Sequence, residues 1–597
     1  MDAPDSIYYF CAKYLTYREF FALQHLIKLF PALAILFALS IILNQIAKKI
    51  SASSSTTSPG ENSTKNTKYQ EKIVYLLRFV SCFSSLLFFG ILAFYLSLLH
   101  GFRVISIELC YTGALAIFSI YGTLFYRFLQ KSRTMLAFFV IAVVLVTGFG
   151  PVLFGDMCQA YLFYPNRRSE YLITSSFTRQ FSLPEACPPG SPCHVYATLP
   201  ENTSDSVFIN FQTNIIHNES KVCFAQDNST ETRYHGNCFP TKIFSLKGVE
   251  KIGQRNIHSA YLFGMLPDTF YSIQIYYDDK LQAEEKYRTL PLDTSAKNIT
   301  IVMGGDIGFL EMAYEVGRHA ATYHPDLIVL GGDLAYDNGM DTCYYTWDQF
   351  LGIFEYMNKV KGSLIPLILT IGNHDASVEA QTIRKVKLDE YGPPYFTFFP
   401  QHSRVSEGGE IIKEVPELEE RKSYFYHIIG GTLQLSLDSG YIAGYNGTQL
   451  EWMKRLNDLH QSRPKFAYYH VPIYWAFGLW EPVAAGTVLG LQYWVPEFDR
   501  SRYLSAWEHH AHLLKRTKPL RGSLPNENGT IYLGEGCWGV RCLGLPLENS
   551  TGVFESFHNR RNHFWLIQLQ EKGVSYTAID INNEVVDYAE QEYEGYL

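Results

Sequence analysis

The chain has 597 residues, which is too long for one compact domain and predicts several structural units. Its formal net charge is −8, only 18% of its residues are charged, and it contains no long basic run. These features exclude the electrostatic attraction that binding to a nucleic-acid backbone requires, so nucleic acid is not an expected partner.

The first part of the chain contains four apolar segments that carry no charged side chain. They cover residues 29–43, 79–99, 109–126 and 135–154. A helix needs about 20 apolar residues to cross the hydrocarbon core of a bilayer. We therefore predict that residues 1–157 form a four-helix transmembrane anchor, through which the chain could form homo-oligomers. A buried helical bundle is the alternative.

The distribution of basic residues predicts the orientation of this anchor. The loops that join the first span to the second and the third to the fourth contain nine Lys and Arg residues, against six on the opposite side. Basic loops stay in the cytosol. We therefore predict an integral, multi-pass membrane protein whose N-terminus and large C-terminal part face the extracellular or lumenal side.

Glycosylation sequons and cysteine spacing agree with a secretory compartment. Beyond residue 155, sequons begin at Asn202, Asn218, Asn228, Asn298, Asn446, Asn528 and Asn549. Three pairs of cysteines are close enough in the sequence for local disulfides, namely Cys187 with Cys193, Cys223 with Cys238, and Cys537 with Cys542. Free buried thiols are the alternative, and Cys158 and Cys343 have no obvious local partner.

Residues 160–292 have the pattern of short antiparallel strands. Apolar and aromatic residues alternate in Tyr271–Tyr277, which predicts a strand with one buried face. Similar short runs are separated by Pro, Gly, Asn and Asp, which favour turns. We predict a small β-sandwich with a supporting rather than a catalytic role.

Residues 296–597 have the pattern of an α/β layered domain. Apolar runs at 299–303, 327–330 and 364–371 predict buried strands, and residues 310–323 predict a helix between the first two. Strands that alternate with helices are typical of layered folds. Further strands are expected at 465–469 and 564–578.

Polar side chains follow these apolar runs at the points where the strands end or nearby. They are Asp306, Asp333, Tyr336, Asn373, His374, His470, His510 and His512. Because polar residues that follow buried strands meet at one edge of a sheet, we expect them to lie together. Carboxylate, amide, imidazole and phenolate groups form a mixed set that suits iron, zinc or manganese. Two such ions about 3.5–4 Å apart could hold a phosphoryl group and share a hydroxide nucleophile, with Asp333 as the central bridging candidate.

Each of these elements also has an ordinary structural explanation. A Gly-Asp pair after a strand is usually a turn or a helix cap. Gly372–Asp375 and His510–His512 could be polar loops. Five such elements in one order, each following or near an extended apolar run, favour a shared metal site over five unrelated turns.

The five elements resemble the motifs of the calcineurin-like metallophosphoesterases and are most similar to those of the purple acid phosphatases. The matching segments are Gly305–Gly308, Gly332–Tyr336, Gly372–Asp375, His470–Tyr474 and His510–His512. Tyr336 is the discriminating residue, since the wider superfamily generally lacks a tyrosine ligand there. The family also carries a fibronectin-like sandwich before its catalytic domain, whereas the four-span anchor is not typical of it.

Together these observations predict a multidomain fold class. N-terminal transmembrane helices would occupy residues 1–157, and a fibronectin type III-like β-sandwich would occupy residues 160–292. An α/β metallophosphoesterase β-sandwich flanked by helices would occupy residues 296–597.

The resemblance implies a role for each matched residue. The implied ligands are Asp306, Tyr336 and His512 for a first ion, Fe(III) by analogy, and Asn373, His470 and His510 for a second, divalent ion (Fe, Zn or Mn). Asp333 would bridge the two ions. His374 would contact the phosphate and assist the leaving group. The implied reaction is in-line attack of metal-bound hydroxide on a small phosphorylated substrate.

The sequence departs from the family around this site. Asp375 and His509 stand where the family often has Glu and Gly. Residues 475–495 contain none of the histidines that many members use to contact substrate, and offer Trp475, Phe477, Trp480 and Trp494 instead. These aromatic residues could favour nucleotides or aryl phosphates, or could be ordinary packing.

We predict a membrane-anchored acid phosphatase that hydrolyses phosphate monoesters. A nucleotidase or phosphodiesterase with the same site is one alternative. A catalytically weak, metal-bound receptor or anchor is another, and the complete ligand set argues against it.

Overall fold

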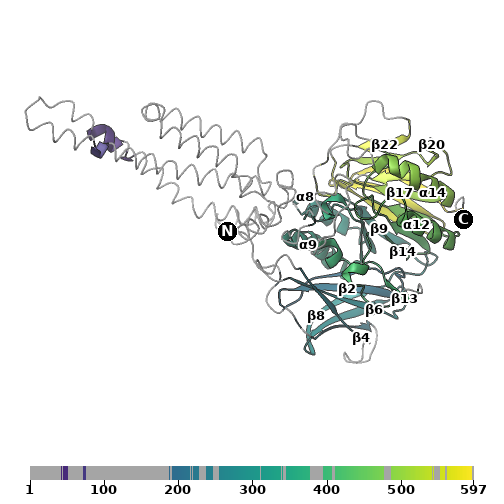
Figure 1. Cartoon of the computed structure of the whole chain (residues 1–597), viewed down its shortest axis with the longest axis horizontal. Helices are drawn as coiled ribbons and strands as arrows, with labels where there is room; N and C mark the ends of the chain where they lie inside the picture. Colours follow the sequence, from purple (N-terminus) through teal and green to yellow (C-terminus); the bar gives the residue numbers. More distant parts are fainter. Residues whose placement is uncertain are drawn as a thin grey trace, which may run out of the picture. The chain divides into compact units, whose positions relative to one another are not determined.

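The computed structural model describes residues 42–43, 45–50, 72–74, 187 and 191–594, without residues 216, 218, 228–236, 247–254, 310, 338, 340–343, 377–393, 407–409, 476–485, 535, 541, 543–551 and 559–560. The chain divides into two compact units, one of Met1–Tyr164 with Ile173–Pro184 and one of Pro165–Leu172 with Glu185–Leu597. The second unit carries the strands and helices that follow (Figure 1).

The predicted membrane spans lie outside the described residues, apart from Ile42 and Leu43. Among the helices that the structure does describe, none combines the length and the apolar character that crossing a bilayer requires. The longest of them, α9 (Tyr344–Lys361), contains charged residues that include Asp348 and Lys359. The predicted localisation, an integral multi-pass membrane protein with an outward-facing catalytic domain, is contradicted by this finding.

Two large sheets and one smaller sheet form the second unit. The ten-stranded sheet has the order β25 (Val585–Glu592), β24 (Gly573–Asp580), β23 (His563–Leu569), β9 (Ile299–Gly304), β10 (Leu327–Leu330), β11 (Leu367–Leu369), β1 (Cys193–Thr198), β2 (Ser206–Thr213), β6 (Asn256–Phe263), β5 (Lys242–Ser245). The seven-stranded sheet has the order β14 (Phe425–Ile429), β15 (Thr432–Ser436), β16 (Lys465–Tyr468), β17 (Tyr503–Glu508), β21 (Ile531–Gly534), β18 (Leu514–Thr517), β22 (Phe554–His558). The four-stranded sheet has the order β4 (Asn237–Pro240), β3 (Ser220–Gln226), β7 (Phe270–Tyr277), β8 (Lys280–Arg288).

Apolar side chains between the sheets form one continuous core. It includes Met303 of β9, Trp507 of β17 and Trp565 of β23, and the rings of the two tryptophans lie 5.5 Å apart. The same core continues into the space between β2 and β7, which belong to the ten-stranded and the four-stranded sheet. Each sheet therefore buries one face against another sheet.

Helices cover the outer faces of the two large sheets in thin layers (Figure 1). Helix α8 (Glu311–Ala321) and α9 pack on β9, β10 and β11, whereas α12 (Thr448–Leu459) and α14 (Val495–Ser501) pack on β15 and β16. The shorter elements are α10 (Asn373–Ala376), α11 (Pro394–Phe398), the π-helical turn Gly490–Trp494, the 3-10 turn Leu418–Glu420, and the strand pairs β12 (Arg404–Val405) with β13 (Ile411–Ile412) and β19 (Leu520–Arg521) with β20 (Leu524–Pro525).

The predicted fold class is wrong in its balance of elements. It combined transmembrane helices with a fibronectin type III-like β-sandwich and an α/β metallophosphoesterase β-sandwich flanked by helices. The described residues instead form mainly β-sheet with few helices, and no described helix can span a membrane. Alternation of strand and helix holds locally around β9, α8 and β10. Antiparallel strands without intervening helices, such as β23, β24 and β25, then extend the same sheet. The domain boundaries at residues 157, 160–292 and 296 stay predictions.

The three predicted disulfides are present, and they join Cys187 to Cys193, Cys223 to Cys238, and Cys537 to Cys542. Cys158 and Cys343 lie outside the described residues, as do the sequon residues Asn218, Asn228 and Asn549. The other four sequon asparagines, Asn202, Asn298, Asn446 and Asn528, are exposed. Glycosylation at the seven sites stays a prediction.

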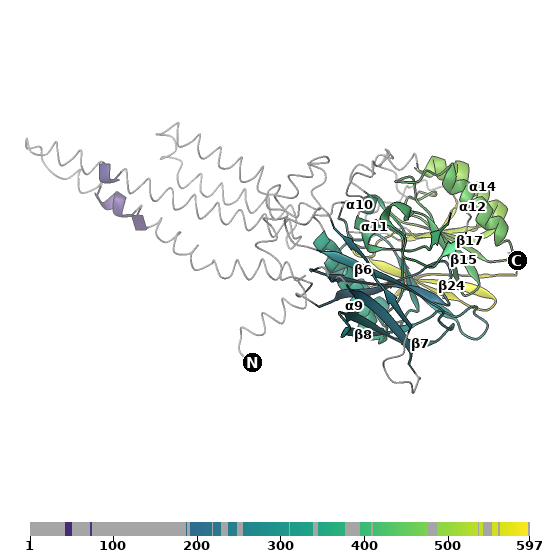
Figure 2. The same ribbon diagram turned by 60° about the horizontal axis from the view of Figure 1, so that its bottom comes forward.

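A buried ion cluster joins α9 to the sandwich strands. Figure 2 shows the α9 ribbon beside these strands. Arg255, next to β6, donates hydrogen bonds of 2.6 and 3.1 Å to the two carboxylate oxygens of Asp348. His194 of β1 lies 3.2 Å from Asp348 Oδ1 and 2.7 Å from Glu355 Oε1. Burial alone would lower the pKa of His194, but the hydrogen bonds that its ring donates to Asp348 and Glu355, together with the charges of these carboxylates, outweigh burial and raise that pKa from 6.5 to about 9.

The His194 cluster predicts a loss of stability at alkaline pH. Because the folded state raises the pKa of His194, its contribution is fully present below pH 6.5 and is lost as the pH rises through about 9. We expect the free energy of unfolding to lose about 3 kcal/mol over this interval relative to His194→Gln. Chemical denaturation of both proteins at a series of pH values measures the difference. A difference that does not change with pH would contradict the assignment.

Candidate metal centre

The eight predicted site residues lie in loops that follow strands of the two facing sheets. Asp306, Asp333 and Asn373 come after β9, β10 and β11, which are parallel neighbours. His470 and His510 come after β16 and β17, which are parallel neighbours in the other sheet. Carboxyl ends of parallel strands meet at one edge of a sheet. Facing edges of two sheets therefore bring these loops together.

The backbone at this edge is held in an uncommon conformation. Five of the seven predicted metal ligands have a positive φ, between 52° and 72°, namely Asp306, Asp333, Tyr336, His510 and His512. Residues other than glycine seldom adopt this region, and such strain persists where the surrounding structure enforces it, often at functional sites. Hydrogen bonds from the amides of Asp306 and Ile307 to the carbonyls of Gly332 and Asp333, both 2.9 Å, hold the first two loops together.

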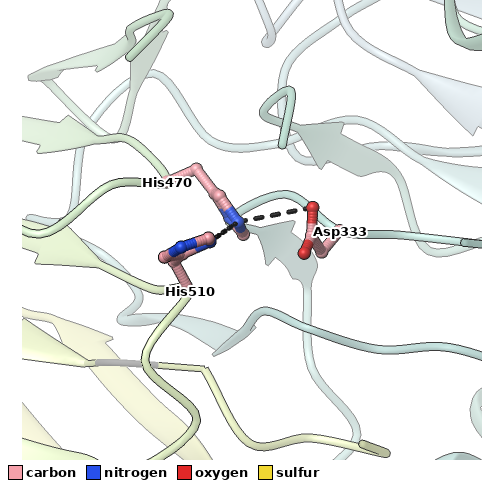
Figure 3. A group of neighbouring side chains, drawn as sticks. All are labelled: Asp333, His470 and His510. Atoms are coloured by element: carbon pink, nitrogen blue, oxygen red, sulfur yellow. Dashed lines mark hydrogen bonds and ion pairs between the residues drawn. The ribbon is translucent and has the colours of Figure 1, made fainter. Parts of the chain in front are cut away.

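Two groups of candidate ligands lie close together, and both include Asp333. Asp333, His470 and His510 form one group, and Asp306, Asp333 and His512 form the other, with ligand atoms within 4.8 Å of one another in each group. Figure 3 shows the first group, in which the His470 ring lies between the Asp333 carboxylate and the His510 ring. The shared aspartate is the geometry that a bridging carboxylate requires.

His470 is oriented by a hydrogen bond on the side of its ring away from the other ligands. Its Nδ1 lies 2.9 Å from the carbonyl oxygen of Gly331, so this nitrogen carries a hydrogen and donates. Its Nε2 lies 3.1 Å from Asn373 Oδ1, 3.2 Å from His510 Nδ1 and 3.3 Å from Asp333 Oδ1. When the ring is neutral with its hydrogen on Nδ1, Nε2 carries a lone pair that faces the lone pairs of these neighbouring ligand atoms.

The pKa shifts of these side chains reflect burial and mutual charge. Burial and the neighbouring His470 lower the pKa of His510 to about 3, so its imidazole is neutral. Burial opposes ionisation of Asp333, but the surrounding histidines outweigh it and hold the pKa of this carboxyl well below its usual range. For His470, burial is outweighed by Asp333 and Asp306, which raise its pKa to about 9. A positive charge is therefore favoured at the centre of this group.

The second group contains Asp306 and His512. Asp306 is fully buried, its Oδ1 lies 2.9 Å from His512 Nε2, and its Oδ2 accepts a hydrogen bond of 2.9 Å from the backbone N–H of His510. Tyr336 lies in the same loop as Asp333, and its ring centroid is 4.3 Å from that of His374. His374 Nε2 is 3.9 Å from Asp333 Oδ2, and burial lowers the pKa of its ring.

The donor chemistry of both groups fits metal ions. Buried carboxylates, an amide oxygen and imidazoles converge, and these are ligands for iron, zinc and manganese. Several of the lone pairs face one another at hydrogen-bond distance, an arrangement that a cation stabilises. Asn373, His470 and His510 with Asp333 could hold one ion. Asp306 and His512 with Asp333, beside Tyr336, could hold a second.

Buried carboxylates outside the ligand groups fix the loops. Asp375 accepts hydrogen bonds from the backbone N–H groups of Leu334 (2.9 Å) and Gly372 (2.8 Å), and so joins the Asp333 loop to the Asn373 loop. Glu508 accepts a hydrogen bond of 2.7 Å from the N–H of Ile473 and forms a fully buried ion pair with Lys515. This ion pair joins the loop after His470 to the strands on either side of His510.

His509, which lies between Glu508 and His510, explains why Gly305 and Gly331 in the Gly-Gly-Asp motifs are glycines. His509 is 1% exposed, and a Cβ at Gly305 or at Gly331 would overlap its ring. Both glycines precede a ligand loop, in Gly304–Asp306 and Gly331–Asp333. At these two positions glycine is required for space, because the His509 ring lies against the backbone.

Sequence reasoning missed the loop 438–443, which contributes to the same edge. It follows β15 with the pattern Leu-Asp-Ser-Gly-Tyr, a strand followed by polar residues, which is the signal that identified the other loops. Ser439 Oγ accepts hydrogen bonds of 3.0 Å from the N–H groups of His470 and Val471. Tyr441 Oη lies 3.5 Å from Asn373 Oδ1. Burial raises the pKa of Tyr441 well above its usual range, so its hydroxyl keeps its hydrogen.

Comparisons with known proteins find one family match and similar phosphatases. Residues 299–498 match the calcineurin-like phosphoesterase family. Purple acid phosphatase 13 of Arabidopsis thaliana is 27% identical over 165 residues, which are 23% of this chain and 30% of that protein. The chain thus matches less than a third of the length of this relative. A purple acid phosphatase from yellow lupin (Lupinus luteus) seeds has a similar fold, with a TM-score of 0.56 and 16% identity over 68% of this chain and 75% of that chain.

The chain therefore contains a calcineurin-like metallophosphoesterase domain and has purple acid phosphatase homologues. This fold implies a dinuclear metal centre, and the two ligand groups around Asp333 are the candidates for it.

The fit of His509 against the two glycines predicts a coupling between distant positions. Gly331→Ala should lower the free energy of unfolding by about 1–3 kcal/mol, because its Cβ overlaps the His509 ring. In the double variant Gly331→Ala/His509→Ala, the loss in free energy of unfolding should be smaller, by a similar amount, than the sum of the losses in the two single variants. Chemical denaturation of the four proteins measures the coupling.

The matched control combines His509→Ala with Gly552→Ala, where an added Cβ meets nothing within 4 Å. These two changes should be additive. Additivity of Gly331→Ala with His509→Ala would show that the ring and the glycine do not depend on each other.

Proposed function

We propose that this chain is an acid phosphatase that hydrolyses small phosphate monoesters at a dinuclear metal centre. The observation that supports it most is the pair of ligand groups that share Asp333. Their members stand in the segments by which the sequence resembles the purple acid phosphatases, and the chain is similar in sequence and fold to phosphatases of this kind. A phosphoester hydrolase is what the matched family implies, and the preference for monoesters and for acidic pH is our proposal.

The proposed ligand sets follow the two groups. Asp306, Tyr336 and His512 would hold Fe(III), Asn373, His470 and His510 would hold a divalent ion (Fe, Zn or Mn), and Asp333 would bridge them. When bound, the two cations supply Lewis acidity to the phosphoryl oxygens and lower the pKa of a water nucleophile toward neutrality. The side chains therefore do not need to provide a strong base.

His374 is the proposed catalytic side chain. It is buried apart from 8% of its surface, and its ring is fixed by the contact with Tyr336 and by the hydrogen bond of 2.8 Å from its backbone N–H to Asp333 Oδ1. An imidazole in this place could contact the phosphoryl group and give a proton to the leaving oxygen. Fixed donors stabilise developing charge without reorganisation at the moment of reaction.

An aromatic residue next to the site is the reason to test nucleotides as substrates. The ring of Trp475 lies 6.3 Å from that of His510 and is half-buried, so one face could stack on an aryl group or a base. Nucleoside monophosphates and a phosphodiester therefore belong in the substrate panel together with p-nitrophenyl phosphate.

The activity itself is the first test of this proposal. The full-length chain should hydrolyse p-nitrophenyl phosphate fastest below neutral pH. Asp333→Ala should lower the rate by at least about 10³-fold and release metal, because both ligand groups lose their shared member. The measurements are the hydrolysis rate and elemental analysis of the purified protein.

A change at the exposed Asp293 provides the matched control, and Asp293→Ala should keep both metal and activity. Full activity in Asp333→Ala would refute the site. A chain that binds two metal ions but hydrolyses nothing in the panel would instead support the alternative of a metal-bound receptor or anchor.

The identity of the first ion has a spectroscopic test. If Tyr336 binds Fe(III), the purified protein should be coloured by phenolate-to-iron charge transfer, and Tyr336→Phe should lose this absorbance while Asp306, Asp333 and His512 keep part of the iron. Visible absorption spectra and iron content measure the two effects. Tyr323→Phe is the control, because this ring packs on Phe564 at 5.7 Å, in the layer of α8. An unchanged band in Tyr336→Phe would remove this tyrosine from the ligand set.

A further inference from the structure

The loop 438–443 holds a tyrosine hydroxyl at the edge of the ligand group around His470. Tyr441 is 3% exposed, its Oη lies 3.5 Å from Asn373 Oδ1, and its ring centroid lies 6.1 Å from that of His470. It comes from the seven-stranded sheet, whereas Asn373 comes from the ten-stranded sheet. The hydroxyl therefore reaches across the junction where both sheets deliver the predicted ligands.

A fully buried aspartate makes this loop rigid. Asp438 accepts hydrogen bonds of 2.8–2.9 Å from the N–H groups of Tyr441, Ile442 and Ala443, and one of 2.6 Å from Ser423 Oγ. The Gln449 side chain closes the loop from the other side, with hydrogen bonds of 2.8 and 3.0 Å to the backbone of Asp438. A hydrogen-bond network of this kind, in which Asp438 and Gln449 do not themselves contact the metal ligands, holds Tyr441 in place before a substrate binds.

The loop is also attached directly to one ligand. Ser439 Oγ accepts from the backbone N–H groups of His470 and Val471, so the position of Tyr441 is tied to that of His470. A side chain fixed in this way keeps its place relative to the metal group when a substrate enters.

The contact between Tyr441 and Asn373 is too long for this hydrogen bond to explain why the Tyr441 hydroxyl is held so firmly in the site. A distance of 3.5 Å is at the limit of a hydrogen bond and is weak compared with the usual 2.7–2.8 Å for a hydroxyl donor. Asn373 Oδ1 also lies 3.1 Å from His470 Nε2, where the predicted ion would engage it. The tyrosine hydrogen is then available to another acceptor in the site.

We propose that Tyr441 is a substrate-binding residue whose hydroxyl donates a hydrogen bond to a non-bridging oxygen of the phosphoryl group. This inference rests on the proposed phosphatase function and adds a binding group to it. His374 would approach the phosphoryl group from the side of Tyr336, and Tyr441 would approach it from the side of Asn373 and His470. Two neutral donors would thus assist the two cations in binding a dianion.

The test compares Tyr441→Phe with the wild-type full-length chain, both loaded with metal. Binding of inorganic phosphate, measured by calorimetry, should weaken by roughly ten- to one-hundred-fold, the usual effect of losing one hydrogen bond to a charged group. KM for p-nitrophenyl phosphate should rise by a similar factor, and the metal content should stay at the wild-type value.

Tyr503→Phe is the matched control from the same sheet. The Tyr503 hydroxyl donates a hydrogen bond of 2.9 Å to Asn457 Oδ1 and its ring packs on Phe498 at 4.6 Å, at the opposite end of β17 from His510, so this change should leave phosphate binding unaltered. A simple loss of folding stability would affect both variants, whereas loss of a phosphate contact affects Tyr441→Phe alone.

Three outcomes overturn the inference. Phosphate binding in Tyr441→Phe equal to that of the wild type would show that the hydroxyl does not reach the substrate. Loss of metal in step with loss of phosphate would show that Tyr441 only positions Asn373. A metal-loaded wild type that neither binds nor hydrolyses phosphates would refute the proposed function together with this inference, and the wild-type measurement alone identifies that case.

Discussion

The buried lone pairs around Asp333 are the constraint on which the rest of this structure depends. A carboxylate, an amide oxygen and two imidazole nitrogens face one another at 3.1–3.3 Å in a site largely sealed from water. Such a cluster is unfavourable unless a positive charge shares it. The charge pattern of the site agrees, since the neighbouring carboxylates raise the pKa of His470 while burial lowers that of His510. The fold must hold these groups together until a cation binds, and its supporting interactions follow from that requirement.

Three buried side chains support the ligand loops through the backbone and do not use the ligand atoms. Asp375, Glu508 and Ser439 all accept hydrogen bonds from backbone N–H groups of the ligand loops or of residues next to them. Each fixes a loop without competing for a lone pair that a metal would use. His509 supports two of the ligand loops by packing, because its buried ring lies against the backbone of Gly305 and Gly331. The strained dihedral angles of five predicted ligands are held by this combination of hydrogen bonds and packing.

The local part of this arrangement could be predicted from the sequence, and the non-local part could not. Apolar runs ending in Gly-Gly-Asp predicted β9 and β10 nearly to the residue, because strand and turn preferences are local. The eight predicted site residues lie together because strand direction decides where loops meet. The long apolar runs of the first 157 residues led to a fold class and a localisation that the described helices contradict. The packing of His509 on glycines two hundred residues away, and the reach of Tyr441 to Asn373, depend on tertiary contacts that no local pattern encodes.

The sandwich strands are part of the support for the metal centre and do not form a detachable spacer. Strand β1 pairs with β2 of the sandwich and also, in parallel, with β11, the strand that leads to Asn373. Tyr196 and Thr198 of β1 donate hydrogen bonds of 2.7 and 2.5 Å to the carbonyls of Phe398 and Pro400, beyond that strand. Without the sandwich strands, β11 would become an exposed edge, and the buried Asp348 would lose Arg255 and His194 together. The uncovered edge would then be the strand that leads to Asn373. The ligand geometry therefore depends on a sheet that continues through both parts of the unit.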